Sequence, residues 1–153
     1  LFPEMSGKAF VSFLARYRGM KNRGRVKELT DRFELDLKQP IRRMSKGDRQ
    51  KLALVCAFMH DPSIVILDEP TAALDPIAEA GIYENFDSLV GEKTAVYISH
   101  RMSSCKFCDR IVVLDHGEIV EEGTHDSLME RNGIYAKLYQ KQAEYYVTAQ
   151  AGA

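Results

Sequence analysis

Four consecutive large aliphatic residues, Ile64-Val65-Ile66-Leu67, constrain the fold of this 153-residue chain more than any other part of its sequence. A short, continuous run of mostly β-branched residues indicates a strand that is buried on both faces of a parallel sheet. Asp68-Glu69-Pro70 ends the run abruptly. We therefore predict a strand that holds two adjacent carboxylates at its carboxyl end.

Strands and helices are expected to alternate after this run. Further strands are predicted at 94–98 and 110–114, with helices at about 77–90 and 102–108. This alternation indicates an α/β fold with parallel strands.

The C-terminal part of the sequence predicts a hairpin and two helices. Asp115-His116-Gly117 separates Ile111-Val112-Val113-Leu114 from Glu118-Ile119-Val120-Glu121, which is typical of a β-hairpin. Thr124 is expected to cap the first of two helices, at about 125–131 and 135–146.

The first third of the chain is predicted to be mostly helical. Apolar residues recur at helical spacing behind Ser6, at Phe10, Phe13, Leu14 and Tyr17. A short helix is expected at about 25–33. A longer one should begin behind Met44-Ser45-Lys46-Gly47 and stop at Asp61-Pro62.

Charge is divided unevenly along the chain. Residues 1–51 hold fourteen Lys and Arg against six Asp and Glu, whereas residues 52–153 hold seven against sixteen. A dense basic run could bind nucleic acid or anionic lipid, or it could be a solvated helix end and loop. No aromatic-rich RNA-binding motif or zinc-finger pattern accompanies the charge, so the solvated surface is the preferred interpretation. The run comprises Arg16, Arg18, Lys21, Arg23, Arg25 and Lys27.

The cysteines and three of the four histidines are not expected to take part in chemistry. Three cysteines in a domain of ordinary size favour a reducing compartment over a disulfide framework. Cys105 and Cys108 have the spacing of a metal or redox pair, but no second ligand pair exists, so helix packing is preferred. We expect surface positions for three histidines: His60, His116 and His125.

The acidic pair suggests chemistry. At the end of a rigid strand, Asp68 can orient a water on Mg²⁺ and Glu69 can polarise an attacking water. Asp68-Glu69-Pro70 could also form a simple turn. The neighbouring motifs therefore decide between a catalytic site and a turn.

Three segments together resemble the ordered motifs of ABC ATPases: Met44-Ser45-Lys46-Gly47-Asp48-Arg49-Gln50, then Ile64 to Pro76, then Ile98-Ser99-His100-Arg101. By this resemblance, residues 45–48 stand at the ATP-sandwiching signature loop. The remaining implied roles are Mg²⁺ binding for Asp68 (Walker B), general base for Glu69, the D-loop for Asp75, and the γ-phosphate switch for His100.

The signature-like loop departs from the family pattern at two positions. Lys46 replaces the first glycine and Asp48 replaces the usual glutamine, whereas Ser45 and Gly47 are retained. A serine and a glycine that open a long helix offer a hydroxyl, backbone N–H groups and the positive end of a helix dipole to a phosphate. Lys46 adds positive charge there, and Asp48 would offset it. We expect a working variant of the loop.

The resemblance implies an α/β fold: a partial P-loop NTPase (RecA-like) core with parallel strands, preceded by an ABC helical subdomain. The expected divisions are 1–62 for the helical subdomain and signature helix, 63–125 for the core portion and 126–153 for the C-terminal helices and tail. No G-x-x-x-x-G-K-[ST] occurs, and only 43 residues precede Met44. We therefore expect the chain alone to be inactive.

The leading hypothesis is an ATP-hydrolysing domain of an ABC transporter, favouring an exporter, that uses ATP and Mg²⁺. Its implied partners are a second ATP-binding domain and a transmembrane domain, at the cytoplasmic side of the membrane. One alternative is a soluble ABC-type ATPase acting on nucleic acid or ribosomes, although nucleic acid is not the expected partner. Another is an inactive fragment.

Two further expectations follow from the resemblance. Residues 1–62 resemble ATP-binding subunits that serve separate membrane partners, whereas residues 64–146 resemble exporters with a fused ATPase, as a hybrid sequence would. In the family the P-loop strand lies between the strands predicted at 94–98 and 110–114. Without it, unpaired backbone groups should leave the isolated chain marginally stable or prone to aggregation unless these two strands pair directly.

Overall fold

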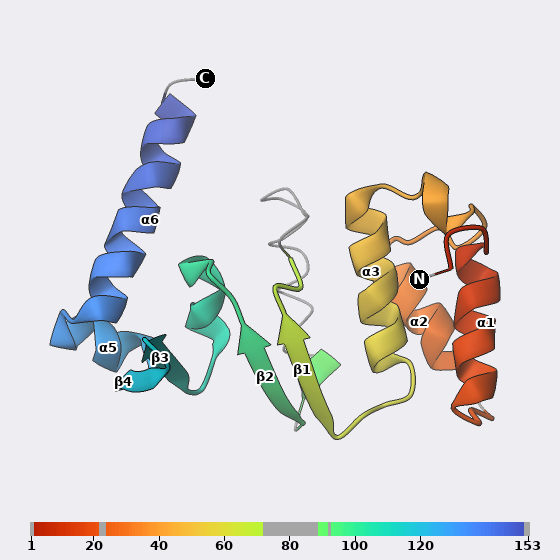
Figure 1. Ribbon diagram of the computed structural model, residues 1–153, viewed down its shortest axis with the longest axis horizontal. Helices are drawn as coiled ribbons and strands as arrows, with labels where there is room; N and C mark the ends of the chain where they lie inside the picture. The colour runs from red at the N-terminus through yellow and green to blue at the C-terminus, as the bar shows by residue number, and fades with distance from the viewer. Residues whose placement is uncertain (1, 22–23, 72–88, 92, 152–153) are drawn as a thin grey trace. The chain divides into compact units, whose positions relative to one another are not determined.

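The computed structural model describes residues 2–21, 24–71, 89–91 and 93–151, and it divides into two compact units, Leu1–Ile98 and Ser99–Ala153. The elements of each unit can be followed in Figure 1. Mixed helices and strands confirm the predicted α/β class. The helix predicted at 77–90 lies almost entirely outside the described residues. The functional divisions at 62 and 125 remain a prediction.

Three helices of the first unit form close to where the sequence predicts them: α1 (Gly7–Tyr17), α2 (Gly24–Arg32) and α3 (Lys46–Phe58). A short 3-10 helix, η1 (Ile41–Arg43), was not predicted. Ser6 caps α1, and its hydroxyl accepts the Ala9 N–H at 3.2 Å.

The apolar stripe of α1 is only partly buried. Phe10 is 7% exposed, but Phe13 is 45% and Tyr17 is 82% exposed. The side chains that α1 does bury are Phe10, Val11 and Ala15.

The core of the first unit is built around α3, which Figure 1 shows between α1 and α2 on one side and β1 (Ile64–Asp68) on the other. Leu52, Val55 and Phe58 of α3 are completely buried. They belong to one apolar cluster with Leu29 of α2 and Leu67 of β1. Burying one such side chain stabilises the fold by about 1.5–3 kcal/mol. The apolar face of α3 therefore holds the sheet against α2.

The sheet of this unit pairs β1 in parallel with β2 (Thr94–Ile98), as predicted. The prediction that β1 is buried on both faces is wrong. Val65 is 5% exposed and packs into the core, whereas Ile66 on the opposite face is 69% exposed. In the part of the chain that the structure describes, the cluster around α3 covers one face of this two-stranded sheet.

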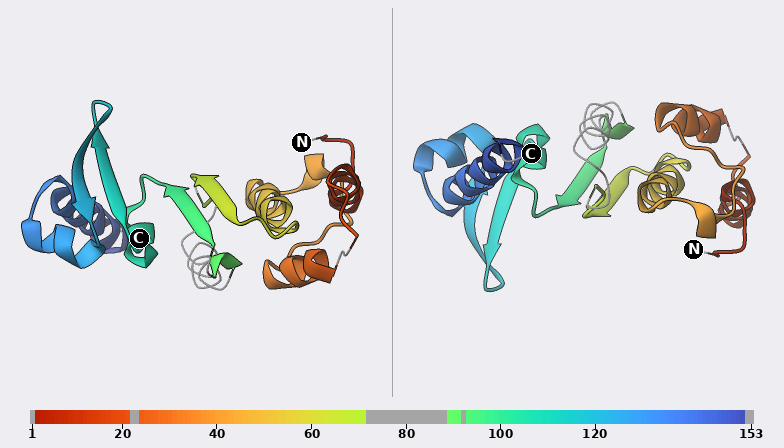
Figure 2. Two further views of the ribbon diagram at one scale, coloured as in Figure 1. Left: turned by 90° about the horizontal axis from the view of Figure 1, so that it is seen from below. Right: turned by 90° about the horizontal axis from the view of Figure 1, so that it is seen from above.

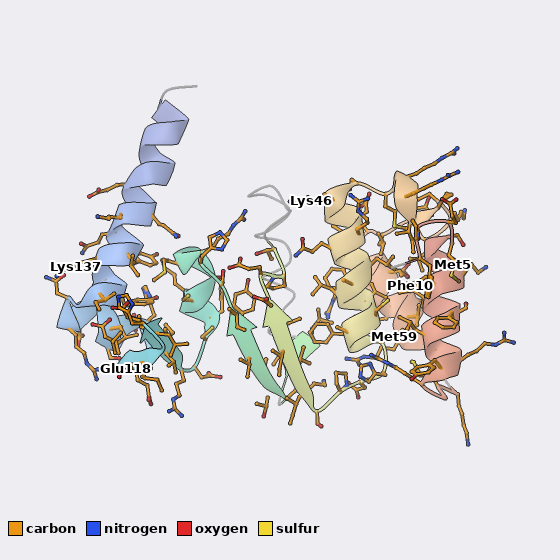
Figure 3. All side chains as sticks on the ribbon, in the orientation of Figure 1. Met5, Phe10, Lys46, Met59, Glu118 and Lys137 are labelled. Atoms are coloured by element: carbon orange, nitrogen blue, oxygen red, sulfur yellow. The ribbon has the colours of Figure 1, made fainter. Side chains whose placement is uncertain are left out.

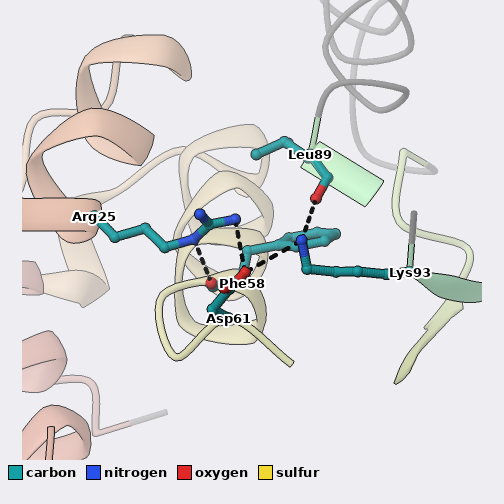
Figure 4. A network of polar contacts seen from close by, with 5 residues as sticks. All are labelled: Arg25, Phe58, Asp61, Leu89 and Lys93. Carbon is teal, nitrogen blue, oxygen red and sulfur yellow. Dashed lines mark hydrogen bonds and ion pairs between the residues drawn. The ribbon is translucent and has the colours of Figure 1, made fainter. Parts of the chain in front are cut away.

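An ionic network joins three elements of the first unit at the amino ends of the strands. Figure 4 shows Arg25 of α2 and Lys93 before β2 reaching Asp61, which follows α3. Each cation lies 3.2 Å from Asp61 Oδ1. Arg25 Nε also donates to the carbonyl of Phe58 at 3.2 Å. The network therefore ties α2 and the sheet to the same turn.

The second unit contains the predicted β-hairpin. Strands β3 (Ile111–Asp115) and β4 (Glu118–Gly123) pair antiparallel, and Figure 2 shows their turn extending away from the helices of this unit. His116 and Gly117 have φ values of 47° and 83°, as a primed two-residue turn requires. An irregularity between Val113 and Leu114 adds a bulge.

Two helices and a 3-10 helix complete the second unit. They are η2 (Met102–Phe107), α5 (His125–Arg131) and α6 (Ile134–Ala151). Thr124 caps α5 through a reciprocal capping box with Ser127. The capping role predicted for Thr124 is thus confirmed.

The small core of the second unit contains one histidine that was expected at the surface. His125 is half-buried, and its Nδ1 lies 2.8 Å from the hydroxyl of the fully buried Tyr135. His60 and His116 are exposed as predicted. Cys105 and Cys108 pack against the same core, and burial raises the pKa of both thiols. These contacts agree with helix packing.

Among the described residues, no helix combines the length and apolar character that a membrane span requires.

Candidate functional site

The signature-like loop forms the start of α3. Ser45 is the helix N-cap, and its hydroxyl oxygen accepts the N–H of Asp48 at 3.0 Å. The same hydroxyl donates to the Asp48 carboxylate at 2.8 Å. The substituted residue, Asp48, therefore engages the hydroxyl that the resemblance assigns to a phosphate.

Cationic side chains surround this helix end. Lys46 and Arg49 are exposed, and Figure 3 shows Lys46 at the end of α3 opposite to Met59. Arg42 and Arg43 immediately precede the loop and are exposed too, with Arg42 paired to Glu4 at 3.2 Å. The helix N-terminus adds a partial positive charge. The arrangement suits an anion such as a phosphate.

The acidic pair lies where the sequence places it, at the carboxyl end of β1. Asp68 is the last residue of the strand, is exposed, and pairs in register with Ile98 of β2. Glu69 is half-buried and has a φ of 47°, in the left-handed region that few non-glycine residues adopt. The Glu69 N–H donates to the carbonyl of Ile98 at 2.9 Å.

Gln50 joins α3 to the acidic pair. Its side-chain Nε2 donates to the carbonyl oxygen of Glu69 at 2.7 Å. Sequence reasoning included Gln50 in the quoted motif but gave it no role. The only sequence signal was its position, five residues after Ser45, which a helix turns to a different face.

Buried residues support the segment that follows the pair. Pro70 and Thr71 are buried, and Thr71 is 2% exposed. Thr71 Oγ1 and Tyr97 Oη lie 3.4 Å apart and share a hydrogen bond. The backbone after Glu69 is therefore tied to β2 by a side chain as well as by the strand pairing.

His100 belongs to the second unit and is exposed. Gln142 of α6 holds its backbone: the amide of Gln142 donates to the His100 carbonyl, and Gln142 Oε1 accepts the Met102 N–H at 2.9 Å. This support was not predicted, because Gln142 lies 42 residues away in a helix with no motif around it. Asp75 lies outside the described residues.

The structure thus brings the predicted site residues together in two groups within the first unit. One group is the loop 45–48 at the start of α3, and the other is Asp68 with Glu69 at the end of β1. Gln50 connects them. His100 is described within its own unit, so its predicted relation to Glu69 stays a prediction.

The residues present fit a magnesium–nucleotide site in one respect. Mg²⁺ in such sites is held by one or two carboxylates together with phosphate oxygens and waters, not by a full protein cage. Asp68 offers an exposed carboxylate at a strand end. No group of three or more His, Cys, Asp or Glu side chains capable of holding a metal occurs among the described residues.

Comparison with known proteins agrees with these motifs. The sequence model of the family described as "ABC transporter" matches residues 1–72. The chain is 42% identical over 117 residues to an ATP-dependent lipid A-core flippase of Shewanella oneidensis, covering 76% of this chain and 20% of the flippase. It is 41% identical over 117 residues to the ABC-type transporter fsqE of Aspergillus fumigatus, covering 76% of this chain and 9% of that protein.

A third relative and a solved structure point the same way. The chain is 46% identical over 97 residues to the subtilin transport ATP-binding protein SpaT of Bacillus subtilis, covering 63% of this chain and 16% of that protein. A bacterial Atm1-family ABC exporter with ATP bound matches with a TM-score of 0.78 and 26% identity, over 94% of this chain and 27% of that chain.

The chain spans only a small part, 9% to 20%, of the length of these curated relatives. Within that part, the motif order, the parallel strand that ends at Asp68 and the capped helix α3 all agree with one family. Over the matched residues, the chain is similar to the ATP-binding domains of ABC transporters.

Proposed function

We propose that this chain supplies the hydrolytic carboxylates and the phosphate-sandwiching loop of an ABC exporter ATPase, which hydrolyses MgATP between two ATP-binding domains. The observation that carries the proposal is the acidic pair Asp68-Glu69 at the end of a parallel strand, joined through Gln50 to a capped, cation-rich helix end. Relatives named as a flippase and a subtilin transport protein support export.

Each residue has a role in this proposal. Glu69 takes a proton from the attacking water while the terminal phosphoryl group leaves ADP, and Asp68 is the carboxylate that holds Mg²⁺. When bound, Mg²⁺ neutralises charge that develops on the phosphates. His100 and Asp75 are proposed to sense the γ-phosphate and the facing domain.

The helix end would act on the ATP of the facing domain. There the γ-phosphate would meet the N–H groups and hydroxyl at Ser45 and Gly47, together with the charge of Lys46. Asp48 opposes this attraction, because its carboxylate accepts the Ser45 hydroxyl and lies in the same loop. The proposed loop is therefore a weakened form of the anion site.

The basic first third gives little support to a nucleic-acid ATPase. Two members of the basic run serve the fold: Arg18 donates to the Cys56 carbonyl at 3.2 Å and contacts His60, and Arg25 pairs with Asp61 at 3.2 Å. A phosphate-tracking surface needs its cations free to reach a backbone. These contacts leave fewer cations of the run free for a nucleic-acid backbone.

The test uses the assembled transporter that contains this chain. Glu69→Gln should lower the ATP turnover number by about 10²- to 10⁴-fold, because it removes a general base, and should leave ATP binding within about twofold. Glu118→Gln, at an exposed position of the hairpin, is the matched control and should change neither the turnover number nor ATP binding. Full turnover in Glu69→Gln would remove Glu69 from the mechanism.

A second measurement separates transport from the alternatives. Copurification with a transmembrane partner and ATP-dependent movement of a substrate into vesicles support the exporter. Salt-dependent nucleic-acid binding without a membrane partner would support the soluble ATPase. Absence of hydrolysis in the assembly would support a non-catalytic fragment.

A further inference from the structure

The backbone conformation of Glu69 is unfavourable for a residue with a side chain. Its φ of 47° brings Cβ close to the neighbouring backbone, and Glu lacks the short side chain that makes this region tolerable for Asn or Asp. Such conformations persist only where surrounding contacts fix them. The direction in which the Glu69 side chain leaves the strand therefore depends on those contacts.

Two hydrogen bonds fix the peptide groups on either side of the Glu69 Cα. The N–H of Glu69 donates to the Ile98 carbonyl at 2.9 Å, which extends the β1–β2 pairing by one step. The carbonyl of Glu69 accepts from Gln50 Nε2 at 2.7 Å. The first bond comes from the sheet and the second from α3, so the residue is held from both sides.

Gln50 is suited to this contact by its place and its chemistry. It is half-buried on α3, and the amide nitrogen of glutamine is a hydrogen-bond donor that carries no charge. Pro70 follows Glu69 and has no N–H of its own. The Glu69 carbonyl is thus a group through which α3 can restrain this turn.

We propose that Gln50 is a positioning residue for Glu69, which couples the phosphate-binding end of α3 to the hydrolytic carboxylate of the same chain. The proposal rests on the proposed ATPase function. Ser45 lies five residues before Gln50, about 7.5 Å along the helix axis. A phosphate that shifts the start of α3 shifts Gln50 with it, because a helix moves as a rigid body over so short a distance.

The first experiment measures ATP hydrolysis by the assembled transporter with three variants. Gln50→Glu keeps the shape but loses the donor, and it should lower kcat about 10- to 100-fold while leaving KM for ATP within about threefold. Gln50→Lys keeps a donor at similar reach and should retain most of kcat. Ala53→Gln, at an exposed position on the same helix, is the control and should match wild type.

Two sets of outcomes distinguish a failure of the positioning role of Gln50 from a failure of the proposed ATPase function. Equal kcat losses in Gln50→Glu and Gln50→Lys would overturn the positioning role, as would a rise in KM without a fall in kcat. Unchanged turnover in Glu69→Gln measured alongside would instead contradict the proposed function.

The second experiment does not depend on activity. Amide hydrogen exchange on the assembled transporter should show faster exchange of the Glu69 N–H in Gln50→Glu, by about two- to tenfold, the range that one hydrogen bond typically contributes to an equilibrium constant. Exchange in Gln50→Lys and Ala53→Gln should match wild type. Unchanged exchange at Glu69 in Gln50→Glu would overturn the proposal even where no turnover can be measured.

Discussion

The hydroxyl of Ser45 donates to the carboxylate of Asp48 at 2.8 Å while it accepts the Asp48 N–H at 3.0 Å. A phosphate that approaches the start of α3 must compete with this carboxylate for the hydroxyl proton and must also meet its negative charge. The same contact that stabilises the helix therefore weakens the anion site.

Replacing Asp48 should separate these two effects. Asp48→Gln should lower the free energy of unfolding by about 0.3–1 kcal/mol, because an acidic residue leaves the first turn of a helix, yet it should lower KM for ATP severalfold in the assembled transporter. Denaturant melts and ATPase titrations provide the measurements. Asp126→Asn, in the first turn of α5, is the control and should reduce stability without changing KM.

The cap of α3 can be tested in a matched pair. Ser45→Ala should cost about 1 kcal/mol of stability by removing an N-cap and should also reduce turnover. Ser6→Ala removes the corresponding cap of α1 and should cost about the same without reducing turnover. Equal turnover in the two variants would show that the Ser45 hydroxyl acts only in the fold.

The ionic network at Asp61 predicts a dependence on pH. Hydrogen bonding to Lys93, then the charge of Arg25, lowers the pKa of Asp61 below its ordinary value of 3.8. A group whose pKa is lowered on folding stabilises the protein above the unfolded pKa. This stabilisation should be present at pH 6, should begin to decline as the pH falls below about 3.8, and should be lost as the pH falls through the lower pKa of the folded state.

The measurement is the thermal midpoint of wild type and Asp61→Asn at pH 6 and near pH 3. The two midpoints should differ at pH 6, and the difference should be smaller near pH 3. The difference at pH 6 should shrink in high salt, since Asp61 is largely exposed. A difference that persists unchanged at pH 3 would contradict the ionic origin.

The start of α6 depends on a carboxylate from β4. Glu121 accepts the backbone N–H groups of Ile134 at 3.0 Å and Tyr135 at 2.7 Å. Glu121→Ala should therefore lower the free energy of unfolding by about 1.5–3 kcal/mol, the range for hydrogen bonds to a charged group. Urea melts measure the change, and Glu130→Gln on the exposed side of α5 is the control.

The exposed apolar face of the β1–β2 sheet predicts low stability and aggregation of the isolated chain. Ile64, Ile66 and Ile98 are 63%, 69% and 51% exposed on the face of the β1–β2 sheet away from the core. We expect a low melting midpoint and aggregation, which Ile66→Thr should reduce because a β-branched polar residue keeps strand propensity. A cooperative melt at high temperature, followed by circular dichroism, would contradict this expectation.

The sequence predicted which helices and strands form, and in what order, better than it predicted which of their faces are buried. Strong local signals marked β1, the turn at His116-Gly117 and the cap at Thr124, and each formed where predicted. The aliphatic run alone could not reveal that Ile66 would be exposed, because a continuous apolar pattern does not say how many layers cover a strand.

The missed parts of the candidate site are contacts between distant segments. Gln50 and Glu69 lie 19 residues apart, and Gln142 and His100 lie 42 apart. Each glutamine is an ordinary helix residue by sequence, and only the packing of its helix gives it a partner. The same reason explains His125, whose burial depends on Tyr135 from the next helix.

Gln142 receives and donates hydrogen bonds at both ends of the peptide segment that follows His100, and it does so from the ninth residue of an 18-residue helix. A protein shortened anywhere before Gln142 would leave those two backbone groups to water. Affinity tags and cleavage sites therefore belong after this position. A proteolytic cut earlier in α6 would therefore loosen the backbone at His100, although the cut lies far from His100 along the chain.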